Sequence, residues 1–273
     1  MNVTVHQRPG VYSAYDASSV VSGSGAGKQV GLVAVNAKAA ANEVKIVTSY
    51  DGAVNAFGQG TMAELVRLAL KNGAGAVAAV PIAGGEGYAD GFAALEGLED
   101  ITAVICDSTD GDVQKAMKQS VETASANRRE RIAVAAGGAG ETVDQLIARA
   151  KALNHERVVL VAPGGVNQNG EAADGLGVAA AVAGAIAGES DPAVPLGGAV
   201  LTGLYGLSGR YSDGEMDRLI LGGVTPVESL AGTIGVVRGV TTRTTTGEAA
   251  DATWRDLTTI RIVDDVIPTL RRA

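Results

Sequence analysis

Two histidines are the side chains best suited to accept a proton from a nucleophile, and their neighbours decide whether they can do so. A Ser-His-Asp hydrolase needs a histidine that accepts the proton of a reactive serine. His6 lies in a polar N-terminal stretch, and His155 stands between Asn154 and Glu156, where a helix is expected to turn into a strand. The sequence contains no Gly-x-Ser-x-Gly pattern. We therefore predict no catalytic triad and interpret His155 as a solvent-exposed turn residue.

Two aspartates, Asp107 and Asp110, follow the apolar run of residues 101–106. Ligand sites of α/β proteins gather where such strands end. Two acids in one loop can hold a metal ion, or they can cap the helix that follows by accepting hydrogen bonds from its first N–H groups. We favour capping, with Asp112 as a further candidate, and predict no metal. Cys106 is most simply a small buried apolar residue.

Glycine-rich segments are a third place where a ligand can bind. Residues 22–29 (SGSGAGKQ) resemble a phosphate-binding loop, but Ser22 stands where that motif has glycine and Gln29 where it has Ser or Thr. The segment also precedes an apolar run rather than a helix, so we favour a flexible linker. Gly164 and Gly165 follow Pro163 at the end of another apolar run, and they fit either a tight turn or close approach to a ligand.

Alternating apolar runs and helical patterns must position these residues. The runs at 101–106, 131–136 and 157–162 alternate with helical patterns over 111–131, 141–154 and 171–188. Continuous apolar strands separated by helices indicate βαβ units in a parallel sheet covered on both faces. Before them we expect strands at 28–36, 43–49 and 76–83, and a helix at 61–72 capped by Thr61 with Glu64.

The composition changes after about residue 200. Alanine becomes rare and Thr and other β-branched residues increase, which favours partly exposed antiparallel strands, including one at 258–263. We predict an α/β fold with a parallel or mixed sheet flanked by helices. Its expected parts are an N-terminal arm and Gly/Ser linker (1–27), an α/β core (28–200) and a β-rich segment that completes the core (201–273).

Composition excludes several classes of protein. Apolar residues make up 46% of the 273 residues, which is too many for a disordered chain, while aromatics make up only 3%. A single cysteine excludes a disulfide scaffold or a Cys-based zinc site. The net charge of −8 disfavours nucleic acid as a partner, and no stretch of 18 apolar residues predicts a membrane span. The 47 alanines and 38 glycines require a core built with closely packed backbones.

Short motifs along the chain resemble, in order, those of contractile phage tail sheath proteins. They begin with Arg8-Pro-Gly-Val-Tyr12 after the alternating Val3-Thr-Val5. The remaining matches are Lys45-Ile-Val-Thr-Ser49 with Ala56-Phe57-Gly58, Asn72-Gly-Ala-Gly-Ala-Val77, Leu219-Ile-Leu-Gly-Gly-Val-Thr-Pro-Val227, Gly239-Val-Thr-Thr-Arg-Thr244 and the stretch from Thr253 to Asp265. Each motif is weak alone, and their order over nearly the whole chain is what indicates the family.

The resemblance implies a structural function. Sheath subunits stack as hexameric rings around an inner tail tube, attach to a baseplate, and contract to drive the tube into the target cell. The resemblance also implies a subtilisin-like core without a working triad, no cofactor, assembly in the host bacterial cytoplasm, and a further C-terminal domain in the full protein. Arms of the family add strands to neighbouring subunits, which assigns that role here to Val3, Val5, Arg8, Pro9, Gly10, Val11 and Tyr12.

One reading from another class is kept as the alternative. A small α/β enzyme or ligand-binding domain would use the loops after Asp107, Gly137 and Pro163. The residues 18–27 can act as a hinge for subunit motion in a sheath, or they can form a loose surface loop. Because no motif supplies a complete set of catalytic groups, we favour the sheath subunit and predict that the chain is not an enzyme.

Overall fold

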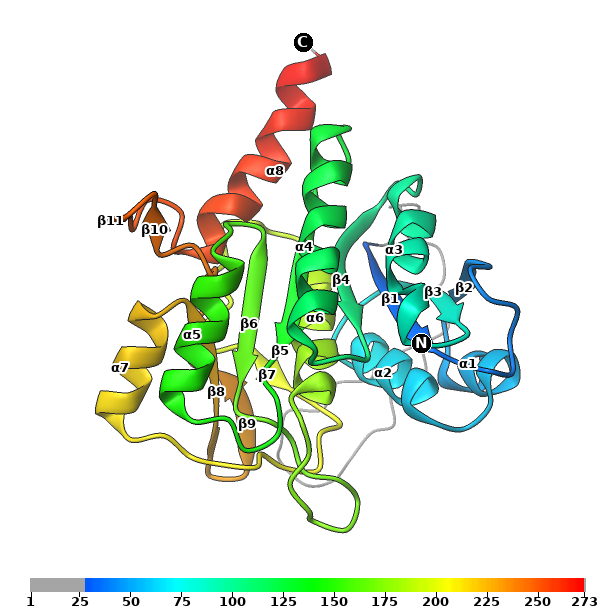
Figure 1. The fold of residues 1–273 in the computed structure, drawn as a ribbon, viewed down its shortest axis with the longest axis horizontal. Helices are drawn as coiled ribbons and strands as arrows, with labels where there is room; N and C mark the ends of the chain where they lie inside the picture. The colour runs from blue at the N-terminus through cyan, green and yellow to red at the C-terminus, as the bar shows by residue number, and fades with distance from the viewer. Residues whose placement is uncertain (1–27, 273) are drawn as a thin grey trace, which may run out of the picture.

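Six strands that run parallel form the middle of a nine-stranded sheet in the computed structural model, which describes residues 28–272 (Figure 1). The strand order is β2-β3-β1-β4-β5-β6-β8-β9-β7, and β2, β9 and β7 run antiparallel to their neighbours. The parallel strands are β1 (Gln29–Val35), β3 (Ala76–Ile82), β4 (Ile101–Cys106), β5 (Ile132–Ala136), β6 (Val158–Ala162) and β8 (Val224–Leu230). The antiparallel strands are β2 (Lys45–Val47), β7 (Val200–Leu201) and β9 (Thr233–Val236).

Helices cover both faces of the sheet, as the sequence predicts. One face packs against α1 (Tyr50–Phe57), α2 (Thr61–Lys71), α6 (Leu176–Gly188) and the start of α8 (Leu257–Arg272). The other face packs against α3 (Tyr88–Glu96), α4 (Gly111–Ala126), α5 (Val143–Leu153) and α7 (Asp213–Leu221). A short 3-10 turn, Gly85–Gly87, precedes α3.

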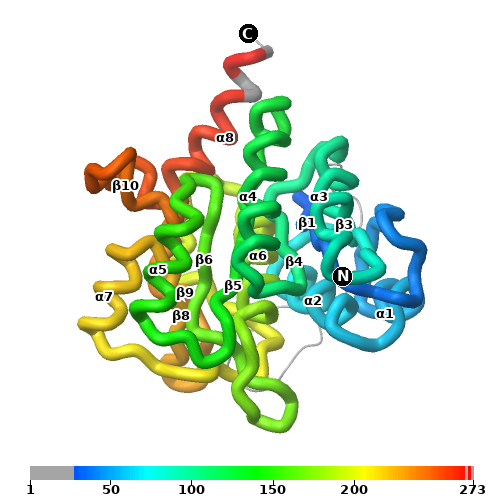
Figure 2. The backbone as a smooth tube through the Cα atoms, in the orientation of Figure 1, coloured from blue at the N-terminus to red at the C-terminus, as the bar shows by residue number. Residues whose placement is uncertain are grey.

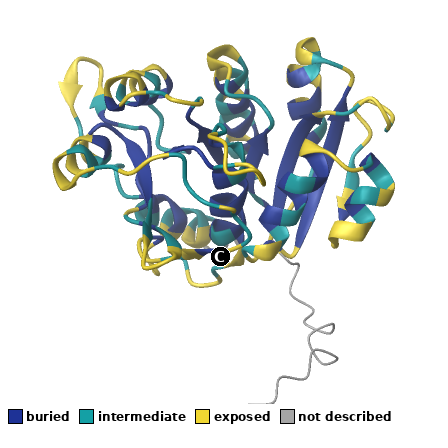
Figure 3. Cartoon of the chain, turned by 90° about the horizontal axis from the view of Figure 1, so that it is seen from below, coloured by how far each residue is buried: buried dark blue, intermediate teal, exposed yellow. Residues whose placement is uncertain are grey.

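Burial on both faces explains why the middle strands are continuously apolar. In β5, Ile132 and Val134 belong to the core beneath α6, while Ala133 and Ala135 belong to the core beneath α4 and α5. Successive side chains of a strand point to opposite faces, so a strand with two covered faces has no position for a polar residue. Figure 3 shows the strands buried and the exposed residues on outer helix faces and loops.

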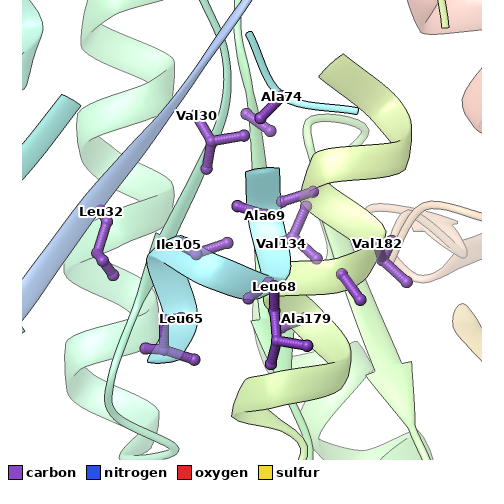
Figure 4. Close-up of a cluster of buried hydrophobic side chains, with 14 of the residues drawn as sticks. Val30, Leu32, Leu65, Leu68, Ala69, Ala74, Ile105, Val134, Ala179 and Val182 are labelled. Atoms are coloured by element: carbon purple, nitrogen blue, oxygen red, sulfur yellow. The ribbon is translucent and has the colours of Figure 1, made fainter. Parts of the chain in front are cut away.

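Small residues let α6 and α2 approach each other closely. Nine of the 13 residues of α6 are buried, and a Cβ added to Gly184 would lie 2.3 Å from the carbonyl oxygen of Ala69 in α2. One turn later, a Cβ on Gly188 would lie 2.7 Å from the Cα of Gly73, which ends α2 with φ +116°. Figure 4 shows Leu68 and Ala69 against Ala179 and Val182. Part of the excess of Ala and Gly is therefore a packing requirement of this helix pair.

The predicted elements of the middle of the chain are confirmed, with changes at helix ends. The helix predicted from residue 171 begins at Leu176, because residues 171–175 bond to the preceding loop, as in Ala173 N–H to Gly165 O. The helix predicted to residue 131 ends at Ala126. Arg131 is buried instead, and its guanidinium donates to the carbonyls of Leu95 and Leu98 at the end of α3.

Two predicted caps are wrong. Thr61 lies inside α2, whose N-cap is Gly60 without a side-chain bond, and Glu64 pairs with Arg67 rather than reaching back to a cap. Asp112 pairs with Lys115, while Asp110 caps α4. Local charge and spacing suggested these caps, but Glu64 and Asp112 each pair with a basic residue three positions later on the same helix.

The strand predicted at 258–263 is wrong, because these residues belong to helix α8. The buried positions of this stretch are Leu257, Ile260 and Arg261, which have a helical spacing of three and four. The β-branched composition favoured a strand, and burial of one helix face against the body overrode that preference.

The segment after residue 200 adds antiparallel strands to the same sheet, as predicted, and also contains the unpredicted helices α7 and α8. A separate two-stranded hairpin, β10 (Thr245–Thr246) with β11 (Ala249–Ala250), stands beside the start of α8. From there α8 extends past the amino ends of the parallel strands (Figure 2). None of the helices in residues 28–272 is long and apolar enough to cross a membrane.

The contact between α6 and α2 yields a stability prediction. Gly184→Ala should destabilise the protein by about 1–3 kcal/mol, because the methyl group meets the Ala69 carbonyl and forces the helices apart. Gly214→Ala in α7 is the matched control, since its added Cβ meets nothing within 4 Å and alanine favours a helix. Urea unfolding at one pH measures both; equal stability of Gly184→Ala and the wild type would contradict the close approach.

Candidate assembly surfaces

The carboxyl ends of β1 and β4 are where an α/β protein most often binds a ligand, and here they are closed by hydrogen bonds. Asp107 accepts from the Val35 backbone N–H through one oxygen (2.9 Å) and from the Tyr88 hydroxyl through the other (2.6 Å). Burial and this bond raise the pKa of Tyr88. Asp107 therefore ties β4 to β1 and to the start of α3.

The second aspartate of this loop caps a helix, as favoured from the sequence. The Asp110 side chain accepts from the backbone N–H groups of Asp112 (2.8 Å) and Val113 (3.1 Å), and these bonds lower its pKa. Over residues 28–272, no group of three or more His, Cys, Asp or Glu side chains is placed to hold a metal ion.

The loops after Gly137 and Pro163 are filled by the protein itself. A Cβ on Gly164 would lie 2.3 Å from the Ala173 carbonyl oxygen, and one on Gly137 would lie 2.6 Å from the Leu146 side chain. The space left between these loops is about 130 Å³, below the usual 300–1,000 Å³ of a ligand pocket. The glycines after Pro163 serve a tight turn, and the space between these two loops is too small for the ligand of the alternative reading.

His155 is not the exposed turn residue predicted from the sequence, since its side chain is only 18% exposed. Its Nδ1 accepts from the Arg157 backbone N–H (3.0 Å), and its Nε2 lies 3.1 Å from Glu122 of α4. The turn is covered by α4 and by residue Thr242, whose hydroxyl accepts from the His155 N–H. Both ring nitrogens are thus used to join the turn to its surroundings.

The remaining sequence candidates are either buried or outside the described residues. Cys106 is buried within β4, as predicted, and burial raises the pKa of its thiol to about 12. Lys28, the lysine of the glycine-rich segment, donates to the Glu189 carbonyl (3.4 Å). Residues 1–27, which include the proposed arm residues Val3 to Tyr12 and His6, lie outside the residues that the structure describes.

Charged groups fix helix α8 to the body at its base and near its end. Arg157, at the start of β6, forms two 2.8 Å bonds to the carboxylate of Asp264, and both side chains are less than one-fifth exposed. Burial raises the pKa of Asp264, against the opposing effect of Arg157. Arg261 donates to the carbonyls of Val194, Glu189 and Asp191, and Arg271 pairs with Glu130 at 2.6 Å.

The opposite face of α8 carries an apolar stripe that sequence reasoning missed. Ile262, Val266 and Leu270 are 39%, 44% and 68% exposed and are spaced four residues apart, which places them on one side of the helix. This spacing is present in the sequence, but the strand predicted at 258–263 hid it. We call these three residues the α8 stripe.

A groove lies at the other end of the molecule, beside the carboxyl ends of the strands. Its volume is about 690 Å³, and the starts of α1 and α2, the β6–α6 loop and residues 203–205 line it. Tyr50 and Tyr205, which are 40% and 56% exposed, both contribute to it. We call it the tyrosine groove. Its residues come from four separate segments, so no local motif revealed it.

Fold and surfaces together define a densely packed α/β scaffold with an exposed apolar stripe at one end and an open groove at the other. A family model described as the phage tail sheath protein central domain matches residues 82–242, which is more than half of the chain. The chain belongs to the phage tail sheath protein family and is a contractile sheath subunit, as the sequence motifs indicated. No significant match was found among curated protein sequences.

Solved sheath proteins share this fold at low sequence identity. The sheath tail protein of Desulfitobacterium hafniense is 14% identical, with a TM-score of 0.73 over 96% of this chain and 82% of that one. The sheath tail protein Lin1278 of Listeria innocua is 14% identical, with a TM-score of 0.70 over 89% and 75%. The helical sheath of the anti-feeding prophage in its contracted state is 18% identical, with a TM-score of 0.69 over 98% and 76%.

The surroundings of His155 predict a loss of stability on acidification. Burial lowers the pKa of His155, and the positive charges of Lys118 and Arg157 lower it further. The carboxylates of Glu156 and Glu122 act in the opposite direction but are outweighed. The stability that neutral His155 provides is full above the unfolded pKa of about 6.5 and is lost as the pH falls towards the lowered pKa.

Replacing His155 should reduce the loss of stability on acidification. His155→Asn should flatten the dependence of the urea midpoint on pH between about 7.5 and about 5, compared with the wild type. The variant keeps His6, so the other histidine serves as the internal control. If the urea midpoints of the two proteins changed with pH in parallel, the loss of stability on acidification could not be assigned to His155.

Proposed function

We propose that this subunit polymerises with other copies as hexameric rings around an inner tail tube, and that contraction of the sheath drives the tube into a target cell. The baseplate is the further partner, assembly takes place in the host bacterial cytoplasm, and the chain performs no catalysis. The observation that carries the proposal is the match of residues 82–242 to the sheath central domain. Likeness to an assembled, contracted sheath over 98% of the chain supports it.

We further propose that residues 1–27 act as an arm that joins subunits, while residues 28–200 and 201–273 form the core. The arm residues are Val3, Val5, Arg8, Pro9, Gly10, Val11 and Tyr12. Strand addition uses backbone hydrogen bonds, so it needs an extended segment and an open sheet edge. The edge strands β2 and β7 are short and carry the exposed residues Ile46 and Val200. These open edges support the proposal that a sheet edge of one subunit receives the arm of a neighbouring subunit.

Self-assembly tests the function directly. The purified full chain should form rings or tubes that are visible by negative-stain electron microscopy. A heterologous contact that does not close on itself extends into a helical array, so the size distribution should grow with concentration. A chain that remains monomeric at high concentration by analytical ultracentrifugation would contradict the proposal.

Deleting residues 1–12 tests the arm. The core should keep its thermal unfolding midpoint, because the buried clusters on both faces of the sheet are closed by helices within residues 28–272, while assembly should weaken. Val3→Pro with Val5→Pro should weaken assembly as well, since proline cannot donate to a strand ladder. Val3→Thr with Val5→Thr is the matched control and should assemble normally. Loss of thermal stability on deletion would mean that the segment belongs to the core instead.

A further inference from the structure

The tyrosine groove is open at the end of the sheet where the neighbouring loops are closed. Its volume is about 690 Å³, which lies within the usual range of about 300–1,000 Å³ for a ligand pocket. The starts of helices and the loops beside them line it, and none of its lining residues belongs to a named strand. The groove therefore offers no strand edge to an extended peptide, and a ligand must be held by its side chains.

Two tyrosines give the groove an aromatic surface. Tyr50 and Tyr205 are the exposed ones among the tyrosines of the described residues, and both line this groove. The hydrogen bond with Glu64 raises the pKa of Arg67, and the nearby phenol groups of Tyr205 and Tyr50 raise it further. Both phenol groups therefore lie near one guanidinium, although Tyr50 begins α1 and Tyr205 follows β7.

Hydrogen bonds hold the walls of the groove in place. Arg67 of α2 donates to the carbonyl of Gly203 (2.9 Å), which ties α2 to the segment that carries Tyr205. The Val166 N–H donates to the carbonyl of Gly206 (3.2 Å), which ties the β6–α6 loop to the same segment. A groove that is formed before its ligand arrives loses less free energy through ordering when the ligand binds.

The other polar side chains of the groove are mostly uncharged. Gln59, Thr61, Gln168 and Asn169 supply amide and hydroxyl groups, which donate as well as accept hydrogen bonds. Asn167 fixes the position of Asn169, because its Oδ1 accepts from the Asn169 N–H (2.9 Å). The groove can therefore bond to a ligand that has both donors and acceptors.

The charges of the groove disfavour an anionic ligand. Among the described residues that line it there is no Lys or Arg. Its two acids are Glu64, which pairs with Arg67, and Asp174, one oxygen of which accepts from the Leu176 N–H (3.2 Å). A phosphate, sulfate or carboxylate would meet the negative charge of Asp174 without a cation in the lining to balance it.

A ligand that matches this lining has an apolar face for the tyrosine rings and uncharged groups that donate and accept hydrogen bonds. Sugar rings have both, because their C–H bonds form apolar faces and their hydroxyls donate and accept. We propose that the tyrosine groove binds a neutral oligosaccharide. This binding activity goes beyond the proposed sheath function and does not rest on it.

An oligosaccharide array tests the proposal with the full-length protein. The array carries neutral oligosaccharides of glucose, mannose, galactose and N-acetylglucosamine beside sulfated and uronic acid oligosaccharides. The protein should bind at least one neutral series, and isothermal titration calorimetry then measures the affinity. The absence of binding to every neutral series at about 1 mM, where even a weak site is substantially filled, overturns the proposal. Binding confined to the acidic oligosaccharides overturns it as well.

Substitution of one tyrosine locates the binding site. Tyr205→Ala should weaken oligosaccharide binding by about tenfold or more, because it removes an aromatic ring from the groove. Tyr205→Phe keeps the ring and should bind nearly as well as the wild type. Leu221→Ala is the matched control, because Leu221 is 60% exposed at the end of α7 and does not line the groove. Equal affinities of Tyr205→Ala and the wild type would place the oligosaccharide elsewhere and overturn the proposal.

The other occupant that the chain itself offers is its N-terminal segment. The chain without residues 1–12 should bind the oligosaccharide with the same affinity as the full chain, and this result supports the proposal. Oligosaccharide binding that appears only after the deletion means that the segment fills the groove of the free protein, and it overturns the proposal. All variants with substitutions should unfold at the wild-type temperature, since Tyr205 and Leu221 are solvent-exposed.

The outcomes separate oligosaccharide binding from sheath assembly. Wild-type tubes from a chain that binds no neutral oligosaccharide would overturn the role of the groove and leave the sheath function intact. Oligosaccharide binding that depends on Tyr205, in a chain that never forms tubes or rings, would support the role of the groove and count against the sheath function.

Discussion

The rest of the structure depends on the close approach of α6 to α2, with almost no side-chain layer between the two helices. Gly184 and Gly188 allow backbone to touch backbone, at separations that leave no room for a methyl group. A helix this apolar on every side is stable only when it is enclosed. Enclosure by the sheet, α2 and the start of α8 therefore fixes the relative positions of these elements, and dense packing resists deformation.

The same dense packing decides where function can lie. The loops that directly follow β4, β5 and β6 are held closed at three points by the chain's own atoms. Asp107 ties two strands together, Leu146 fills the space beside Gly137, and a loop carbonyl closes on Gly164. The surfaces available for binding other molecules are therefore the sheet edges, the tyrosine groove and the α8 stripe. This agrees with a family whose members act through contacts between subunits.

How much the sequence predicts depends on where each residue finds its partners. Strands β4, β5 and β6 and their helices were predictable, because burial on two faces makes them continuously apolar. Helix α8 was not, because its inward face includes Arg261 and Asp264, whose partners are distant in sequence. The exposure of His155 was mispredicted for the same reason, since α4 covers it from 33 residues away. The family was recognisable from ordered motifs, whereas the tyrosine groove required four segments to be placed together.

The anchoring of α8 bears on how a subunit of this kind transmits motion. Substituting either partner of a buried ion pair leaves the other charge buried without a partner, which costs about 3–5 kcal/mol. The pair between Arg157 and Asp264 links α8 to the start of β6, and the loss of either side chain would weaken this link. The second pair, between Arg271 and Glu130, restrains the helix near its end. A helix held at both places has a fixed orientation relative to the sheet, so α8 and the sheet form one rigid unit of the described chain.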